Sequence, residues 1–160
     1  MTTDTTPVHA IDKVAFFDAL ATEMNAHPEV YEVLGDVDMD LAIVMTDPHG
    51  GFRVRVTFEG ITCAGVDEIG DGDERTTSCF LEGPVGEWQA MFDDIVAHGH
   101  ATGWWTINSL TLVGDKIAVH GDDPLGVDLF FRFNQTVQSF LDGAATVLCP
   151  APAATATGPV

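Results

Sequence analysis

The feature that most constrains the fold is the strict alternation of apolar and polar residues between Phe52 and Glu59. In this segment, FRVRVTFE, the phenylalanines and valines occupy every second position, and arginine, threonine and glutamate occupy the others. Successive side chains of a strand point to opposite faces, so one face of this strand is apolar and the other is polar. Such a strand is typical of an antiparallel sheet with one side in water.

Other segments of the chain read as neighbouring strands of the same sheet. These segments, residues 40–46, 61–68 and 76–82, are short and rich in apolar residues. Turn-forming runs at 47–51 and 70–73 separate the first strand from the second and the third from the fourth. Four consecutive strands with tight connections predict a meander rather than a βαβ array. Residues 110–113 and 116–120 flank Gly114-Asp115, which predicts either a hairpin turn or a short rise into one final strand.

Three segments have helical periodicity. Residues 11–26 are predicted as the first helix, ended by Pro28, and residues 84–98 as the second, followed by Gly99. The second helix carries Trp88, Met91, Phe92, Ile95 and Val96 on one face. The last helix is predicted over residues 124–144, with Asp123 as its N-cap.

These elements predict one α+β domain over residues 9–148, with a twisted, mainly antiparallel five-stranded sheet covered by helices. A hydrophobic fraction of 46% in 160 residues, including ten phenylalanines, is sufficient for a sizeable core. Residues 1–8 and 149–160 are rich in threonine, alanine and proline, and we expect both ends to be disordered.

The charge is strongly acidic: 25 aspartates and glutamates against six lysines and arginines give −19. We expect no nucleic-acid partner and no stable membrane insertion, because binding to either polyanion draws on clustered basic residues. Three explanations of the acidity stay open, namely solubility, adaptation to high salt, and docking of a basic partner.

The sequence also indicates a cytoplasmic protein. No apolar run approaches the ~20 residues of a membrane span, and the first residues do not resemble a secretory signal. Cys63, Cys79 and Cys149 form neither a disulfide framework nor a zinc pattern, and the first two read as buried apolar residues.

No motif for catalysis stands out, and no cofactor or metal is expected. His98-Gly99-His100 offers two imidazoles, but this spacing alone is a weak metal signal, and histidine near a helix end is also favoured by the helix dipole. An aspartate in an apolar cavity could act as a general base. Asp40, Asp67, Asp93 and Asp128 are the candidates, although each fits a solvated face better.

The aromatic residues are the stronger signal. Three segments that should cover the same sheet carry seven of them: Trp88, Phe92, Trp104, Trp105, Phe130, Phe131 and Phe140. They either form the ordinary core or line a cavity for an apolar ligand. Phe130, Phe131 and Phe133 lie within four residues and cannot all share one helical stripe, which favours a contact with a ligand or a partner.

The order of elements resembles the sterol carrier protein (non-specific lipid-transfer) domain. The likeness is best around the start of the helix at Gly83–Met91 and the strand GDKIAVHGD at Gly114–Asp122. The resemblance implies a largely antiparallel sheet covered by helices around a tunnel for sterols, fatty acids or acyl-CoA. By position, it implies a tunnel lined by Trp88, Met91, Phe92, Ile95, Val119, Val127, Phe130 and Phe131.

The sequence therefore predicts a protein that binds or carries a hydrophobic small molecule, such as a lipid, a sterol or an acyl chain. Ten residues are predicted to line its cavity, the eight implied by the resemblance together with Trp104 and Trp105. Two alternatives are a small cone-like enzyme acting on a cyclic substrate with an aspartate or histidine base, and an acidic interaction module. In the latter, an exposed aromatic patch would form an interface, as in a homodimer.

Overall fold

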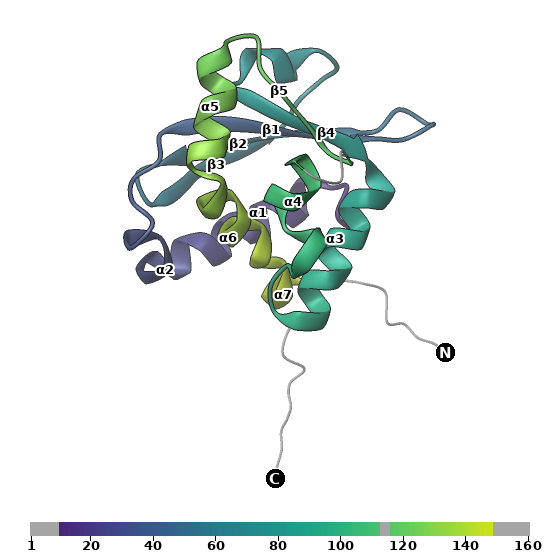
Figure 1. The fold of residues 1–160 in the computed structure, drawn as a ribbon. Coiled ribbons are helices and arrows are strands. Elements are labelled where there is room, and N and C mark those ends of the chain that lie inside the picture. Colours follow the sequence, from purple (N-terminus) through teal and green to yellow (C-terminus); the bar gives the residue numbers. More distant parts are fainter. Residues whose placement is uncertain (1–9, 113–115, 149–160) are drawn as a thin grey trace, which may run out of the picture.

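A computed structural model of the chain describes residues 10–112 and 116–148. It contains one five-stranded sheet, ordered β3-β2-β1-β4-β5, with most of the helices gathered on one of its faces (Figure 1). The strands are β1 (Met39–Thr46), β2 (Phe52–Glu59), β3 (Thr62–Glu68), β4 (Cys79–Pro84) and β5 (Ala118–His120). The α+β class and the mainly antiparallel sheet are as predicted.

The alternating strand behaves as its sequence predicts. β2 spans the predicted residues, with its phenylalanines and valines buried and its arginines partly exposed. It pairs antiparallel with β1 and with β3, so the first three strands form a meander. Its apolar residues face the covering helices, which places the core on that side of the sheet.

The predicted four-strand meander is wrong at its last strand. β4 returns to the other side of β1 and pairs with it in parallel, with Leu81 opposite Ile43. The 3₁₀ helix η1 (Asp73–Thr76) lies within the connection that carries the chain from β3 to β4. β1 is therefore a central strand, buried on both faces, which explains why its sequence is a continuous apolar run.

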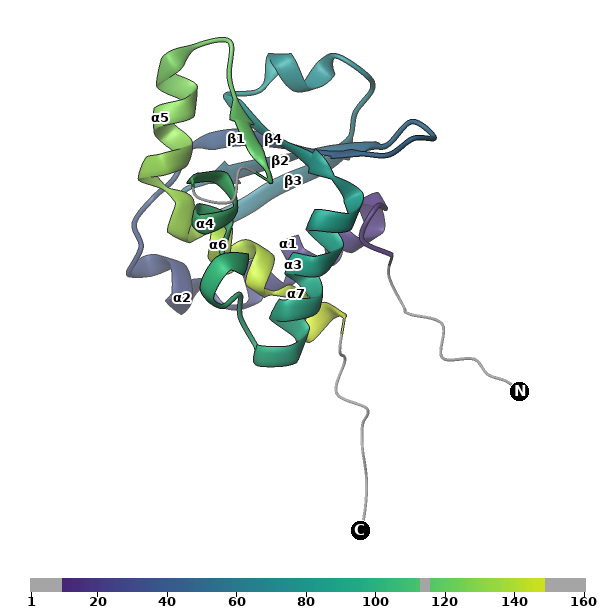
Figure 2. The ribbon, with the colours of Figure 1, turned by 45° about the vertical axis from the view of Figure 1, so that its right-hand side comes forward.

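Seven α-helices and a second 3₁₀ helix complete the described fold (Figure 2). They are α1 (Val14–Ala26), α2 (Pro28–Glu32), α3 (Val85–His98), η2 (Gly103–Trp105), α4 (Ile107–Leu112), α5 (Pro124–Arg132), α6 (Asn134–Asp142) and α7 (Ala144–Val147). The first two predicted long helices are α1 and α3, and Gly99 ends α3 with a positive φ of 87°. No helix within the described ranges is long and apolar enough to cross a membrane.

The predicted final helix is broken into three. Asp123 caps α5 as predicted, since its carboxylate accepts a hydrogen bond of 3.0 Å from the backbone N–H of Leu125. The helix then breaks at Phe133, where the side-chain amide of Asn134 donates to the carbonyl of Phe131 at 2.7 Å. Such local side-chain bonds compete with helical hydrogen bonds. A second break at Gly143 separates α6 from α7.

The hairpin alternative is wrong, because residues 110–112 do not form the first strand that it needs. Up to Leu112 this segment belongs to α4, while Val113 and the predicted Gly114-Asp115 turn lie outside the described residues. The hydroxyl of Thr106 accepts a hydrogen bond of 3.1 Å from the N–H of Ser109, which is an N-cap interaction. This cap favours a helix where the apolar residues alone suggested a strand.

Candidate functional site

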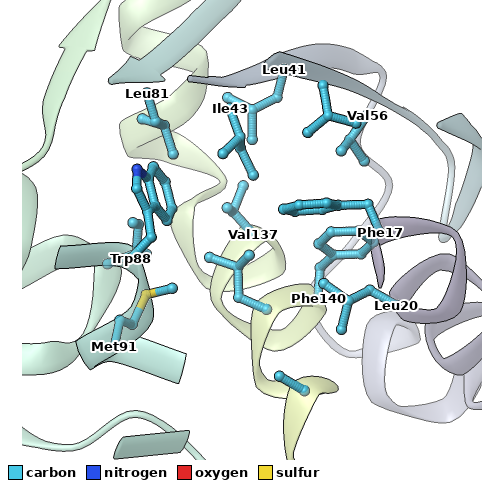
Figure 3. Close-up of a cluster of buried hydrophobic side chains, with 14 of the residues drawn as sticks. Phe17, Leu20, Leu41, Ile43, Val56, Leu81, Trp88, Met91, Val137 and Phe140 are labelled. Atoms are coloured by element: carbon cyan, nitrogen blue, oxygen red, sulfur yellow. The ribbon is translucent and has the colours of Figure 1, made fainter. Parts of the chain in front are cut away.

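The candidate site is the apolar layer between the sheet and its helices (Figure 3). Strands β1, β2 and β4 contribute Leu41, Ile43, Val56 and Leu81 to it. Helices α1, α3 and α6 contribute the side chains on the opposite side, among them Phe17, Leu20, Trp88, Met91, Val137 and Phe140. Residues far apart in the sequence thus meet in one continuous core.

Five of the ten predicted lining residues lie inside this core. Trp88, Met91, Phe92, Ile95 and Phe130 are all fully buried. The ring of Phe92 meets that of Phe16 edge to face at 5.0 Å, and Phe130 meets Phe131 in the same way at 5.1 Å. These close aromatic contacts show a packed layer, so the internal cavity stays a prediction.

The other five lie at its margin or at the surface. Trp105, Val119 and Phe131 are half-buried and pack against the core. Val127 is half-buried beside Gly121, and Trp104 is 69% exposed. Phe133 is also half-buried, so the aromatic run of α5 does extend beyond one buried stripe.

One polar atom stands out in this apolar layer. The indole nitrogen of Trp88 is the single buried side-chain nitrogen or oxygen without a hydrogen-bond partner among residues 10–112 and 116–148. Its ring points from α3 toward Leu81 and Ile43 (Figure 3). A buried N–H that makes no hydrogen bond destabilises the fold by about 1–3 kcal/mol, so an acceptor placed here would be bound favourably.

The four candidate bases do not lie in the core. Asp40 is half-buried and accepts a hydrogen bond of 2.8 Å from the Ser78 hydroxyl. Asp67 pairs with Arg55 at 3.3 Å, and Asp93 accepts from Gln89. Asp128 is exposed on α5. The structure therefore brings none of these carboxylates to the apolar layer.

The two histidines of the 98–100 segment make local contacts. The Nδ1 atom of His98 lies 3.0 Å from a carboxylate oxygen of Asp94, and Nδ1 of His100 lies 3.0 Å from the carbonyl of Ala101. Within the described residues, no group of three or more histidines, cysteines, aspartates or glutamates is arranged to hold a metal ion.

Comparison of sequences yields no match to a family model or to a curated protein. Comparison of structures yields a crystal structure of sterol carrier protein 2, with a TM-score of 0.65 and 15% identity, covering 85% of this chain and 98% of that one. This chain has a sterol-carrier-like fold. The sterol-carrier-like fold also occurs in a conserved hypothetical protein from Thermus thermophilus, described as possibly a sterol carrier protein. That solution structure has a TM-score of 0.65 and 14% identity, covering 95% of this chain and 99% of that one.

Proposed function

We propose that this protein binds or carries a hydrophobic small molecule, such as a lipid, a sterol or an acyl chain, between its sheet and its helices. The observation that carries the proposal is the unpaired indole N–H of Trp88, fully buried in an otherwise apolar layer. A ligand with a carbonyl, ester or hydroxyl oxygen would accept this hydrogen bond while its apolar part displaces core contacts.

The fold supports the same proposal. Both structural neighbours are named as a sterol carrier or a possible one, and their sheet-and-helix arrangement is shared over most of this chain. Each CH₂ group of a ligand removed from water contributes roughly 0.8 kcal/mol. A long acyl chain therefore needs few polar contacts to bind with a Kd of roughly 1 μM, equivalent to about 8 kcal/mol.

The proposal assigns two roles to the ten predicted lining residues. Five of them are fully buried against neighbours, so they would move apart to admit the ligand: Trp88, Met91, Phe92, Ile95 and Phe130. The partly exposed Trp105, Val119, Val127 and Phe131 would surround its entrance together with Trp104. Homodimer formation through exposed aromatic residues stays a prediction.

The test is native mass spectrometry of freshly purified protein, followed by organic extraction and titration with a fluorescent fatty acid and a fluorescent sterol. We expect a co-purified lipid or saturable binding of at least one probe. Trp88→Phe should weaken that binding about two- to tenfold, the worth of one neutral hydrogen bond. Phe80→Leu is the control, because Phe80 is a buried aromatic residue on the other face of the sheet, outside the ten lining residues, and should leave affinity unchanged. Failure to detect either a lipid or binding would contradict the proposal.

A further inference from the structure

A pocket lies between α1, α2, α6 and α7, at the margin of the apolar layer. It has a volume of about 280 Å³, close to the lower end of the roughly 300–1,000 Å³ found for small-molecule sites. Its described lining contains Glu23, His27, Tyr31 and Asp142, together with the short apolar side chains of Val30 and Ala145. Among the described residues that line it, none is a lysine or an arginine.

Tyr31 provides an unpaired polar group in this pocket. The residue is only 3% exposed, and its phenol makes no hydrogen bond to any residue in the described parts of the chain. Its oxygen is not a fully buried atom, unlike the indole nitrogen of Trp88, and so remains accessible from the pocket. Burial, followed by the negative charges of Asp142 and Glu23, raises the pKa of Tyr31. The phenol oxygen therefore lies within the field of both carboxylates and keeps its proton.

The two carboxylate oxygens of Asp142 differ in their hydrogen bonds to the described residues. Its Oδ1 atom accepts hydrogen bonds from the N–H of Ala101 at 3.1 Å and from the side-chain amide of Gln138 at 2.8 Å. Its Oδ2 atom accepts none from the described residues. Burial raises the pKa of this half-buried carboxyl. Two imidazoles are the basic groups nearby. The charge of His100 opposes the rise in the pKa of Asp142. The Nδ1 atom of His27 lies 3.5 Å from Oε2 of Glu23.

These groups are hydrogen-bond acceptors, and two of them are carboxylates, which suits a positively charged ligand. A protonated primary amine carries three N–H donors and no acceptor. The Oδ2 atom of Asp142, the phenol oxygen of Tyr31 and the carboxylate of Glu23 provide three acceptors in one pocket. We propose that this pocket binds the ammonium group of a small primary alkylamine, with the alkyl part against Val30 and Ala145.

The chemistry of the pocket favours an amine over other small ligands. An anion would meet two carboxylates in a chain of net charge −19. A neutral alcohol would donate one hydrogen bond and leave most of the carboxylate oxygens unpaired. The strongly negative chain also concentrates cations near its surface, which accelerates their association. This proposal does not depend on the lipid-binding proposal, because none of the ten residues proposed to line the lipid site lines this pocket.

The test is an NMR titration of the ¹⁵N-labelled full chain with n-butylammonium chloride in 0.15 M NaCl. At pH 8.5 an alkylammonium group keeps its proton, since amines of this kind have pKa values of about 10.4. We expect saturable shifts centred on the backbone amides of Tyr31, Gly99 and Gly143. 1-Butanol and sodium butyrate at equal concentrations should give no saturable shifts at these positions.

Two variants assign the binding to named groups. Asp142→Asn should weaken affinity at least tenfold, since it removes the charge while its amide oxygen still accepts from Ala101 and Gln138. Tyr31→Phe should weaken affinity severalfold. Asp93→Asn is the control for the lost charge, because Asp93 is exposed on α3 away from the pocket.

Three results would overturn the proposal. One is equal binding of butanol and butylammonium, and another is an equal loss of affinity in Asp142→Asn and Asp93→Asn. The third is the absence of saturable shifts in the wild-type protein. Thermal unfolding of each variant, followed by circular dichroism, establishes that the compared proteins are folded. Lipid binding measured in the same variants distinguishes failure here from failure at the apolar layer.

Discussion

Gly126 of α5 lies directly against the main-chain carbonyl of Ser78, which precedes β4. A methyl group at Gly126 would overlap that carbonyl oxygen, and the glycine itself is buried. The absence of a side chain therefore sets how closely α5 approaches the sheet. Asp40 also fixes Ser78, because its carboxylate accepts hydrogen bonds from both the N–H and the hydroxyl of Ser78.

Gly126→Ala should destabilise the protein by about 3 kcal/mol or more, at the upper end of overpacking costs, because backbone must move to admit the methyl group. Urea unfolding at pH 7 measures the effect. Gly86→Ala is the matched control in α3, where an added methyl group meets no atom within 4 Å. That variant should be as stable as the wild type or slightly more stable, since alanine favours helix over glycine. Equal stability of the two variants would contradict the close approach.

Val137→Ala should weaken the fold while strengthening the proposed ligand binding. Val137 is fully buried in the apolar layer near Trp88 (Figure 3), so the variant should lose roughly 1.5–3 kcal/mol of stability. The vacated space lowers the cost of separating sheet and helices, and affinity for a fluorescent fatty acid should rise severalfold.

Val44→Ala is the control for this comparison. Val44 is equally buried but packs with Ala42 and Phe80 on the other face of the sheet. It should lose similar stability with no gain in affinity. A gain in affinity in both variants would mean that general loosening of the fold causes the effect. No gain in affinity in either variant would mean that the ligand does not bind in the apolar layer.

Asp94→Ala should detach the segment that follows α3. The Asp94 carboxylate accepts hydrogen bonds from the N–H of Thr102 at 2.6 Å and from its hydroxyl at 2.9 Å. Losing these charge-assisted bonds should cost about 1.5–3 kcal/mol and increase hydrogen exchange at Thr102. Asp93→Ala, one residue away and exposed, should change neither quantity.

The elements with a strong local pattern were predictable from the sequence. The alternation of β2, the spacing of Trp88 and Phe92 on α3, and the Asp123-Pro124 start of α5 each fix a local structure within a few residues. Pairing between distant segments was not predictable in this way. β4 returns beside β1 in parallel, and the only local sign of that second partner is the continuous apolar run of β1.

The candidate sites show the same division. The helical face carrying Trp88 follows from residue spacing, and the sterol-carrier-like fold agrees with the resemblance. The unpaired state of its indole N–H depends on every neighbour in the packed layer and has no sequence signal. Tyr31 and Asp142 are far apart in the chain, and only the packing of the helices, with α1 against α6 and α7, brings them to one pocket.

Cys79 makes the stability of the protein sensitive to alkaline pH. Burial, with a smaller effect of the Asp40 charge, raises the pKa of this thiol from 9.0 to about 12. Above pH 9 the unfolded chain releases the thiol proton while the folded protein retains it. The unfolded state therefore binds fewer protons, and the free energy of unfolding falls as pH rises from about 9 to about 12.

Cys79→Ala removes this titration without adding a polar group. Urea unfolding at pH 8, 9, 10 and 11 should show a steeper loss of stability in the wild type than in the variant, with the difference appearing only above pH 9. Below that pH both states keep the thiol proton, so the two curves should run parallel there. Because Cys63 and Tyr31 also have raised pKa values, the variant should retain part of the alkaline loss. Curves that stay parallel up to pH 11 would mean that the Cys79 thiol ionises in the folded state as readily as in the unfolded chain.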